Sequence, residues 1–213
     1  MNDIPIYSKR GQGYPVPRQG RDAPRPMSGM VLAGGASRRM GQNKAELVLN
    51  GKTLLQHQVD KLCALGIEDI MLSGAGCPHL PGTRVIPDAF PGKGPLAGLH
   101  ACLKAAENPA CLVLSVDVPL VPASALSQLC RTHREGVTVL YHGEREEPLI
   151  AVYDRAAAAP IQAMLERGER MVRALKDSVP WNRFPYLGPE ELLLNCNRPE
   201  DFDEVIAILS KKG

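Results

Sequence analysis

The sequence has few aromatic side chains and little net charge. Phe, Trp and Tyr together make up 4% of the 213 residues, which argues against a protein that stacks single-stranded bases. The formal net charge is only +2, and five of the cations lie within the first 27 residues. The rest of the chain is therefore nearly neutral, which excludes a general polyanion binder. We expect no nucleic-acid partner.

Long apolar runs and closely spaced cysteine pairs are also absent. No window approaches 18 uninterrupted apolar residues, so we expect no membrane span, and the N-terminus lacks the apolar region of a secretory signal. The six cysteines contain no C-x-x-C pair, the short spacing that a zinc site would use. We expect buried thiols, Cys102 and Cys111 among them, in a reducing cytoplasm.

The N-terminal segment differs in composition from the rest of the chain. Residues 1–27 contain five prolines and three glycines and show no hydrophobic period, so we interpret them as a flexible tail. A chain of 213 residues fits one domain with such a tail. We therefore expect a single domain over residues 28–213.

Hydrophobic patterning within this domain alternates between strands and helices. The apolar run 111–116 is typical of a parallel strand that is covered on both faces. The alternation predicts right-handed βαβ units and a three-layer α/β/α, Rossmann-like fold with a mainly parallel sheet. The predicted strands are 29–33, 70–73, 84–86, 111–116, 137–141, 148–153 and 191–195, and the predicted helices are 53–65, 95–106, 122–132, 155–167, 169–176 and 199–210.

The first strand leads into a loop suited to phosphate. Gly34 and Gly35 let the backbone bend so that its N–H groups approach an anion, and Arg38, Arg39 and Lys44 add positive charge. The spacing is neither G-x-G-x-x-G nor that of a P-loop, so neither named motif applies. The alternative is a tight turn followed by a solvated basic loop.

Two further loops follow predicted parallel strands, where ligands bind in such folds. Asp117 comes directly after the run 111–116 and suits Mg²⁺ held between protein and phosphates, or else a turn or a helix cap. Residues 87–98 form a loop rich in glycine and proline that leads into a helix. Its backbone could wrap a base or a sugar. Asp88 in this loop could accept from ribose hydroxyls, bind metal or stabilise a turn.

Several motifs together resemble one family. Residues 32–45, LAGGASRRMGQNKA, closely resemble the LAGGxSxRMGxxKA motif of nucleotidyltransferases that activate small metabolites. Within that superfamily the chain from residue 29 to about 210 resembles the molybdenum cofactor guanylyltransferases. Four more segments match theirs in the same order: 91–98 (PGKGPLAG), 115–119, 142–150 (HGEREEPLI) and 193–201 (LLNCNRPED).

This resemblance implies transfer of GMP from GTP to Mo-molybdopterin, which releases pyrophosphate. It implies that Lys44, Arg39 and Asp117 are catalytic, that Asp117 binds Mg²⁺, and that Asn195 and Asn197 lie near the pterin. The nucleotide-binding residues that it implies are Leu32, Ala33, Gly34, Gly35, Lys44, Ser73, Asp88, Gly98 and Asp117.

The chain departs from the family pattern at Ser73, where the family often has asparagine. A shorter side chain would weaken or relocate that nucleotide contact. Residues 1–27 also lie outside the family pattern.

The partners and the rival functions follow from the same resemblance. Besides small-molecule substrates, it implies an upstream molybdenum-insertion protein and apo-molybdoenzymes or their chaperones. We expect a monomer or a weak oligomer. The alternatives are a cytidylyltransferase on the same cofactor, a sugar-phosphate nucleotidyltransferase and a non-catalytic cofactor carrier. The sequences LAGG and GPLAG are of the guanine type, and Lys44 together with Asp117 favours an enzyme over a carrier.

Overall fold

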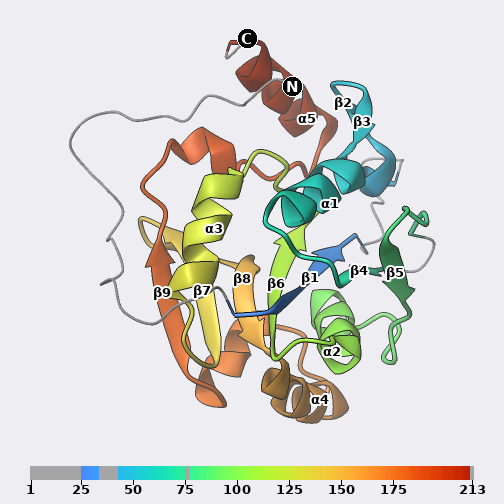
Figure 1. The fold of residues 1–213 in the computed structure, drawn as a ribbon, viewed down its shortest axis with the longest axis vertical. Helices are drawn as coiled ribbons and strands as arrows, with labels where there is room; N and C mark the ends of the chain where they lie inside the picture. The colour runs from blue at the N-terminus through green and yellow to red at the C-terminus, as the bar shows by residue number, and fades with distance from the viewer. Residues whose placement is uncertain (1–24, 34–42, 75–76, 212–213) are drawn as a thin grey trace.

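The computed structural model of the chain describes residues 25–33, 43–74 and 77–211. In these ranges a seven-stranded sheet carries helices on both faces, which confirms the predicted three-layer fold (Figure 1). The strand order is β5-β4-β1-β6-β8-β7-β9. The strands are β1 (Met27–Leu32), β4 (Ile70–Ser73), β5 (Thr83–Ile86), β6 (Ala110–Ser115), β7 (Val137–His142), β8 (Arg145–Asp154) and β9 (Trp181–Pro185).

The sheet is mainly parallel, as predicted. β1 pairs in parallel with both β4 and β6, β4 pairs in parallel with β5, and β7 with β9. β8 runs antiparallel to β6 and β7. Every residue of β6 is buried, as expected for a central strand with both faces covered.

Helices α1 (Leu54–Ala64) and α3 (Ala123–Thr132) pack on one face of the sheet, and α2 (Pro95–Ala105) and α4 (Ala158–Glu166) on the other. The C-terminal α5 (Pro199–Ser210) joins the first face. None of these helices in the described ranges is long and apolar enough to cross a membrane.

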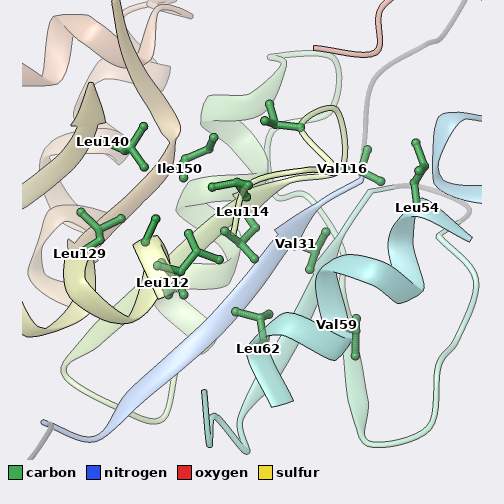
Figure 2. Close-up of a cluster of buried hydrophobic side chains, with 14 of the residues drawn as sticks. Val31, Leu54, Val59, Leu62, Leu112, Leu114, Val116, Leu129, Leu140 and Ile150 are labelled. Carbon is green, nitrogen blue, oxygen red and sulfur yellow. The ribbon is translucent and has the colours of Figure 1, made fainter. Parts of the chain in front are cut away.

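Successive side chains of each strand point to opposite faces, so the sheet supports two separate cores. On one face Val31 packs in a cluster with Val59 and Leu62 of α1 (Figure 2). On the other face Met30 belongs to a cluster with Leu99 of α2. The sheet thus holds β1 between two apolar layers, and its end is fixed in position.

A short hairpin, β2 (Val48–Leu49) and β3 (Lys52–Thr53), precedes α1 and was not among the predicted elements. Its turn is formed by Asn50 and Gly51, with φ values of 49° and 78°. An Asn-Gly pair is the preferred sequence for such a two-residue turn, so the signal was present in the sequence.

Two predictions for the second half of the domain differ from the structure. The strand expected at 191–195 is wrong, because the 3₁₀ helix η4 (Glu190–Leu193) begins there after Pro189. The last strand is instead β9, which lies at the edge of the sheet. Pro180 before it and Pro185 at its end obscure the strand pattern in the sequence, and prolines are tolerated in edge strands.

The helix expected at 169–176 is the 3₁₀ helix η3 (Val172–Asp177). It begins only at Val172, and before it the Glu169 carboxylate accepts from the N–H groups of Arg170 and Met171. A 3₁₀ turn, η2 (Arg155–Ala157), forms the start of the helix expected at 155–167.

The six cysteines are free thiols. Cys102, Cys111 and Cys196 are buried, and burial raises the pKa of Cys102 to about 12, so this thiol stays protonated near neutral pH. The expectation of a buried thiol is confirmed for these three. It is wrong for Cys63, which is exposed on α1.

Candidate active site

The carboxyl ends of four parallel strands lie in one row. Leu32 of β1 pairs with Ser73 of β4 on one side and with Ser115 of β6 on the other, and Ser73 pairs with Ile86 of β5. Beyond this row the Ala33 N–H donates to the Ser73 carbonyl at 2.9 Å. Since the chain runs from β1 to β4 and β5 on one side and returns to β6 on the other, a ligand crevice is expected here.

Lys44 and Asp117 meet at this edge of the sheet. Lys44 begins the 3₁₀ helix η1 (Lys44–Glu46), and its Nζ lies 3.3 Å from Oδ1 of Asp117. The Asn43 side chain caps η1 by accepting from the Ala45 N–H, and Ala45 is buried. The side chains of Lys44 and Asp117 are 14% and 31% exposed, so solvent and a ligand can reach both charges.

The segment before α5 completes the surroundings of this pair. Asn197 Oδ1 accepts from Lys44 Nζ at 2.8 Å, and the Cys196 N–H donates to the Asp117 carbonyl at 2.8 Å. The Asp201 carboxylate accepts from the Asn197 N–H and fixes the start of α5. Asn197 therefore contacts the Lys44 ammonium directly, and its expected location near the pterin stays a prediction.

The environment of Asp117 shifts its titration. Burial raises the pKa of the Asp117 carboxyl, and the neighbouring Lys44 charge partly opposes this by lowering it. Within the described ranges no group of three or more His, Cys, Asp or Glu side chains gathers in a metal-binding arrangement. One reachable carboxylate suits Mg²⁺, which commonly takes one or two protein carboxylates and completes its shell with phosphate and water oxygens.

Ser73, Asp88 and Gly98 form a second cluster beside β1. The Ser73 hydroxyl donates to Asp88 Oδ1 at 3.2 Å, so this buried serine holds the aspartate of the glycine-rich loop. A Cβ on Gly98 of α2 would lie 2.1 Å from the Ser73 Oγ and 3.2 Å from a methyl group of Leu32. Gly98 is therefore required for the close approach of α2 to the ends of β1 and β4.

The structure brings most of the predicted site residues to this one edge. Asn195 joins them through its carbonyl, which accepts from the Asn197 N–H. Gly34, Gly35 and Arg39 lie outside the described residues. The predicted residues that the structure describes are Leu32, Ala33, Lys44, Ser73, Asp88, Gly98, Asp117, Asn195 and Asn197.

Two polar residues of α1 that support the site were not predicted from the sequence. Gln58 is fully buried and donates through Nε2 to the carbonyls of Ser115 and Val118, at 2.8 and 2.9 Å. Lys61 donates to the Pro119 carbonyl at 2.5 Å. The available signal was that Gln58 lies on the apolar face of the predicted helix.

Several known proteins are similar to this chain in sequence over most of its length. The family model of the MobA-like NTP transferase domain matches residues 29–179. A protein of Opitutus terrae named "Probable molybdenum cofactor guanylyltransferase" is 40% identical over 83% of this chain and 93% of its own length. The molybdenum cofactor guanylyltransferase of Yersinia pseudotuberculosis is 32% identical over 83% of this chain and 93% of its own length.

Solved structures share the fold. Molybdopterin-guanine dinucleotide biosynthesis protein A from Archaeoglobus fulgidus superposes with a TM-score of 0.71 at 24% identity, covering 87% of this chain and all of that chain. A nucleotidyl transferase from Methanothermobacter thermautotroptrophicus gives a TM-score of 0.73 at 19% identity, covering 88% of this chain and 99% of that chain.

Proposed function

The chain belongs to the MobA-like NTP transferase family, and from this premise we propose that it transfers GMP from GTP to Mo-molybdopterin. The products are the guanine dinucleotide form of the cofactor and pyrophosphate. The observation that carries the proposal is the pairing of Lys44 with Asp117 at the carboxyl edge of β1 and β6. The named relatives supply the identity of the base and of the acceptor.

The chemistry requires positioning and charge neutralisation. A terminal phosphate oxygen of Mo-molybdopterin forms a bond to the α-phosphorus of GTP, while the bond from that phosphorus to the α,β-bridging oxygen breaks. Pyrophosphate leaves with the bonding electron pair. Because the attacking group is already an anion, no general base is required, and alignment with charge stabilisation does most of the work.

Lys44 is the cation placed to bind the phosphates. Its ammonium has three N–H donors, and the structure places Asn197 Oδ1 and Asp117 Oδ1 beside two of them. A donor remains for a phosphate oxygen. Each pair of like charges held ~4 Å apart at an effective dielectric constant of about 20 costs about 4 kcal/mol, so such a cation is needed where two polyanions meet.

Asp117 is the residue that would hold Mg²⁺. When bound there, Mg²⁺ would neutralise charge on the triphosphate. We further propose that Gly34, Gly35 and Arg39 bind phosphates, and that Leu32, Ala33, Ser73, Asp88 and Gly98 form the nucleoside side of the site. Asp88 keeps its second carboxylate oxygen for a nucleotide hydroxyl or amino group, since its Oδ1 accepts from Ser73.

The acceptor side and the cellular setting are part of the proposal. Asn195 and Asn197 lie beside Lys44 and Asp117, so an acceptor that reaches the α-phosphorus would pass them. We propose that the protein works in the cytoplasm as a monomer or weak oligomer. It would receive its substrate from a molybdenum-insertion protein and pass the product to apo-molybdoenzymes or their chaperones.

The rival functions are less well supported. The curated relatives described above are named for guanylyl transfer, and cytidylyl transfer has no counterpart among them. A carrier without catalysis would have no need for a reachable lysine and aspartate side by side at a triphosphate site.

The test is product analysis. The purified protein is incubated with Mo-molybdopterin and Mg²⁺ together with GTP or, separately, CTP, and the pterin products are identified by mass spectrometry while pyrophosphate is measured. We expect the guanine dinucleotide and one pyrophosphate per transfer with GTP. A cytosine dinucleotide as the main product, or no pyrophosphate with either nucleotide, contradicts the proposal.

A further inference from the structure

The loop that carries Asp117 leaves the sheet and is held by other elements. β6 ends at Ser115, and the Val116 N–H still donates to the Leu32 carbonyl of β1 at 3.2 Å. The carbonyls of Ser115, Val118 and Pro119 accept from side chains of α1. Three carbonyls near Asp117 in sequence are therefore held by side chains of one helix, α1.

Gln58 makes two of these bonds with a single amide group. Its Nε2 donates both of its hydrogens, to Ser115 O at 2.8 Å and to Val118 O at 2.9 Å. These acceptors lie two residues before and one residue after Asp117. The amide therefore spans the Asp117 backbone and fixes the turn from both sides.

The Gln58 side chain is fully satisfied at its other end too. Its Oε1 accepts from Lys61 Nζ at 3.1 Å, and Lys61 also holds the Pro119 carbonyl. Burying an amide costs free energy unless all its hydrogen bonds are made. An apolar side chain would avoid this cost at a position on the apolar face of α1. A glutamine at this position is explained by the bonds that it makes to the loop of Asp117.

We propose that Gln58 is a positioning residue that sets the direction of the Asp117 carboxylate. This inference rests on the proposed function, because it takes Asp117 as the Mg²⁺ ligand at the triphosphate. Gln58 is fully buried, and its amide bonds go to the protein, so its role would be indirect. It acts through the backbone of Asp117, as the outer partners of metal ligands do, whose loss typically costs about 10–100-fold in metal affinity or activity.

The experiment measures the gain in GTP affinity caused by Mg²⁺. The full-length protein is titrated with GTP by calorimetry, once with EDTA and once with Mg²⁺, for the unaltered chain and for Gln58→Met, which keeps the length but removes the amide. The matched control is Gln56→Met on the same helix, where the amide bonds Asp60 instead. Gln58→Asn, which keeps an amide on a shorter arm, replaces Gln58→Met if the latter does not fold.

We expect GTP affinity in EDTA to stay within about twofold in all variants. The gain from Mg²⁺ should fall by about tenfold or more in Gln58→Met and persist in Gln56→Met, in line with the loss of an outer partner. A lowered Tm with an unchanged Mg²⁺ gain would show that Gln58 is only structural and would overturn the inference. If the unaltered protein itself shows no Mg²⁺ gain, both the inference and the proposed metal role are overturned.

Discussion

Two lysines in this protein form ion pairs of very different kinds. Lys44 is 14% exposed and contacts both Asp117 and Asn197, whereas Lys52 is 56% exposed and pairs with Asp60 on the surface. Exposed pairs contribute little because water screens them and side-chain entropy opposes them. We therefore expect Lys44, and not Lys52, to act in the proposed transfer, because Lys44 lies at the ends of the strands and has two oxygen partners.

Replacing Lys44 by methionine removes the charge and keeps most of the side-chain volume. We expect kcat/KM for GMP transfer to fall about 10²–10³-fold, the usual loss when one preorganised donor is removed from a charged transition state. The measurement is steady-state pyrophosphate release. Lys52→Met serves as the control and should stay within about twofold, and equal losses in the two variants would reject the special role of Lys44.

The half-buried Lys61 of α1 is expected to make stability depend on pH. Burial lowers the pKa of Lys61 to about 7, so between pH 7 and about 10 the unfolded chain binds a proton that the native state lacks. Stability rises with pH wherever the unfolded state binds more protons, here by at most about 1.4 kcal/mol per pH unit.

Urea unfolding at pH 6 to 9.5 measures this effect. We expect the free energy of unfolding of the unaltered chain to rise with pH relative to that of Lys61→Met. The exposed Lys104→Met should follow the unaltered chain. Parallel pH curves for the unaltered chain and Lys61→Met would show that Lys61 keeps its ordinary titration.

Among the elements, those with a local signal could be predicted from the sequence. The apolar run of β6 and the amphipathic pattern of α1 each lie within one stretch of chain, and both elements are present as expected. β9 could not be predicted in this way, because its strand character comes from pairing with β7 at the sheet edge. Pro180 and Pro185 conceal it in the sequence.

Parts of the candidate site also have a local signal in the sequence. The glycine-rich loop and Asp117 could be identified because both follow predicted parallel strands. The contact from Asn197 to Lys44 joins residues 153 positions apart, and no local pattern indicates it. The bonds from Gln58 depend on how α1 packs against the end of β6, which only the folded structure provides.

The packing of α2 on the sheet can be tested at Gly98. In Gly98→Ala the new Cβ would force the Ser73 hydroxyl to turn away and lose its bond to Asp88. We expect a loss of about 1–3 kcal/mol in the free energy of unfolding, as for other overpacked cores, together with weaker GTP binding.

Ser73→Ala removes the atom that the new Cβ would meet first. We expect the double variant Gly98→Ala, Ser73→Ala to recover part of the free energy of unfolding that Gly98→Ala loses, as measured by urea unfolding. The GTP affinity should not recover, because the bond from Ser73 to Asp88 is still absent. Additive losses of stability in the double variant would mean that the two residues do not crowd each other.

At the scale of the whole molecule, the site is closed by a segment from beyond the matched domain. The family match ends at residue 179, and the residues that reach back to Lys44 and Asp117 follow η4 and lead into α5. Parallel strands direct their carboxyl ends to one edge, and the end of the chain then covers that edge. The C-terminal segment thus contributes contacts to the candidate site.

The N-terminal boundary of the domain can be tested by truncation. β1 begins at Met27, and Arg25 donates to the Arg134 carbonyl at 2.9 Å. We expect removal of residues 1–24 to change the Tm and the GTP affinity little, as the composition predicts for a tail. Removal of residues 1–30 takes most of β1 from the centre of the sheet and should abolish cooperative thermal unfolding. A large loss in the shorter truncation would show that the tail stabilises the domain.

The most direct test of the account is a crystal structure of the protein with GTP and Mn²⁺, read by anomalous scattering. We predict a manganese peak within about 2.0–2.3 Å of an Asp117 carboxylate oxygen. The triphosphate should lie over the ends of β1 and β6 within hydrogen-bonding reach of Lys44 Nζ. A nucleotide bound elsewhere, or manganese on other residues with Asp117 still paired to Lys44 alone, would contradict it.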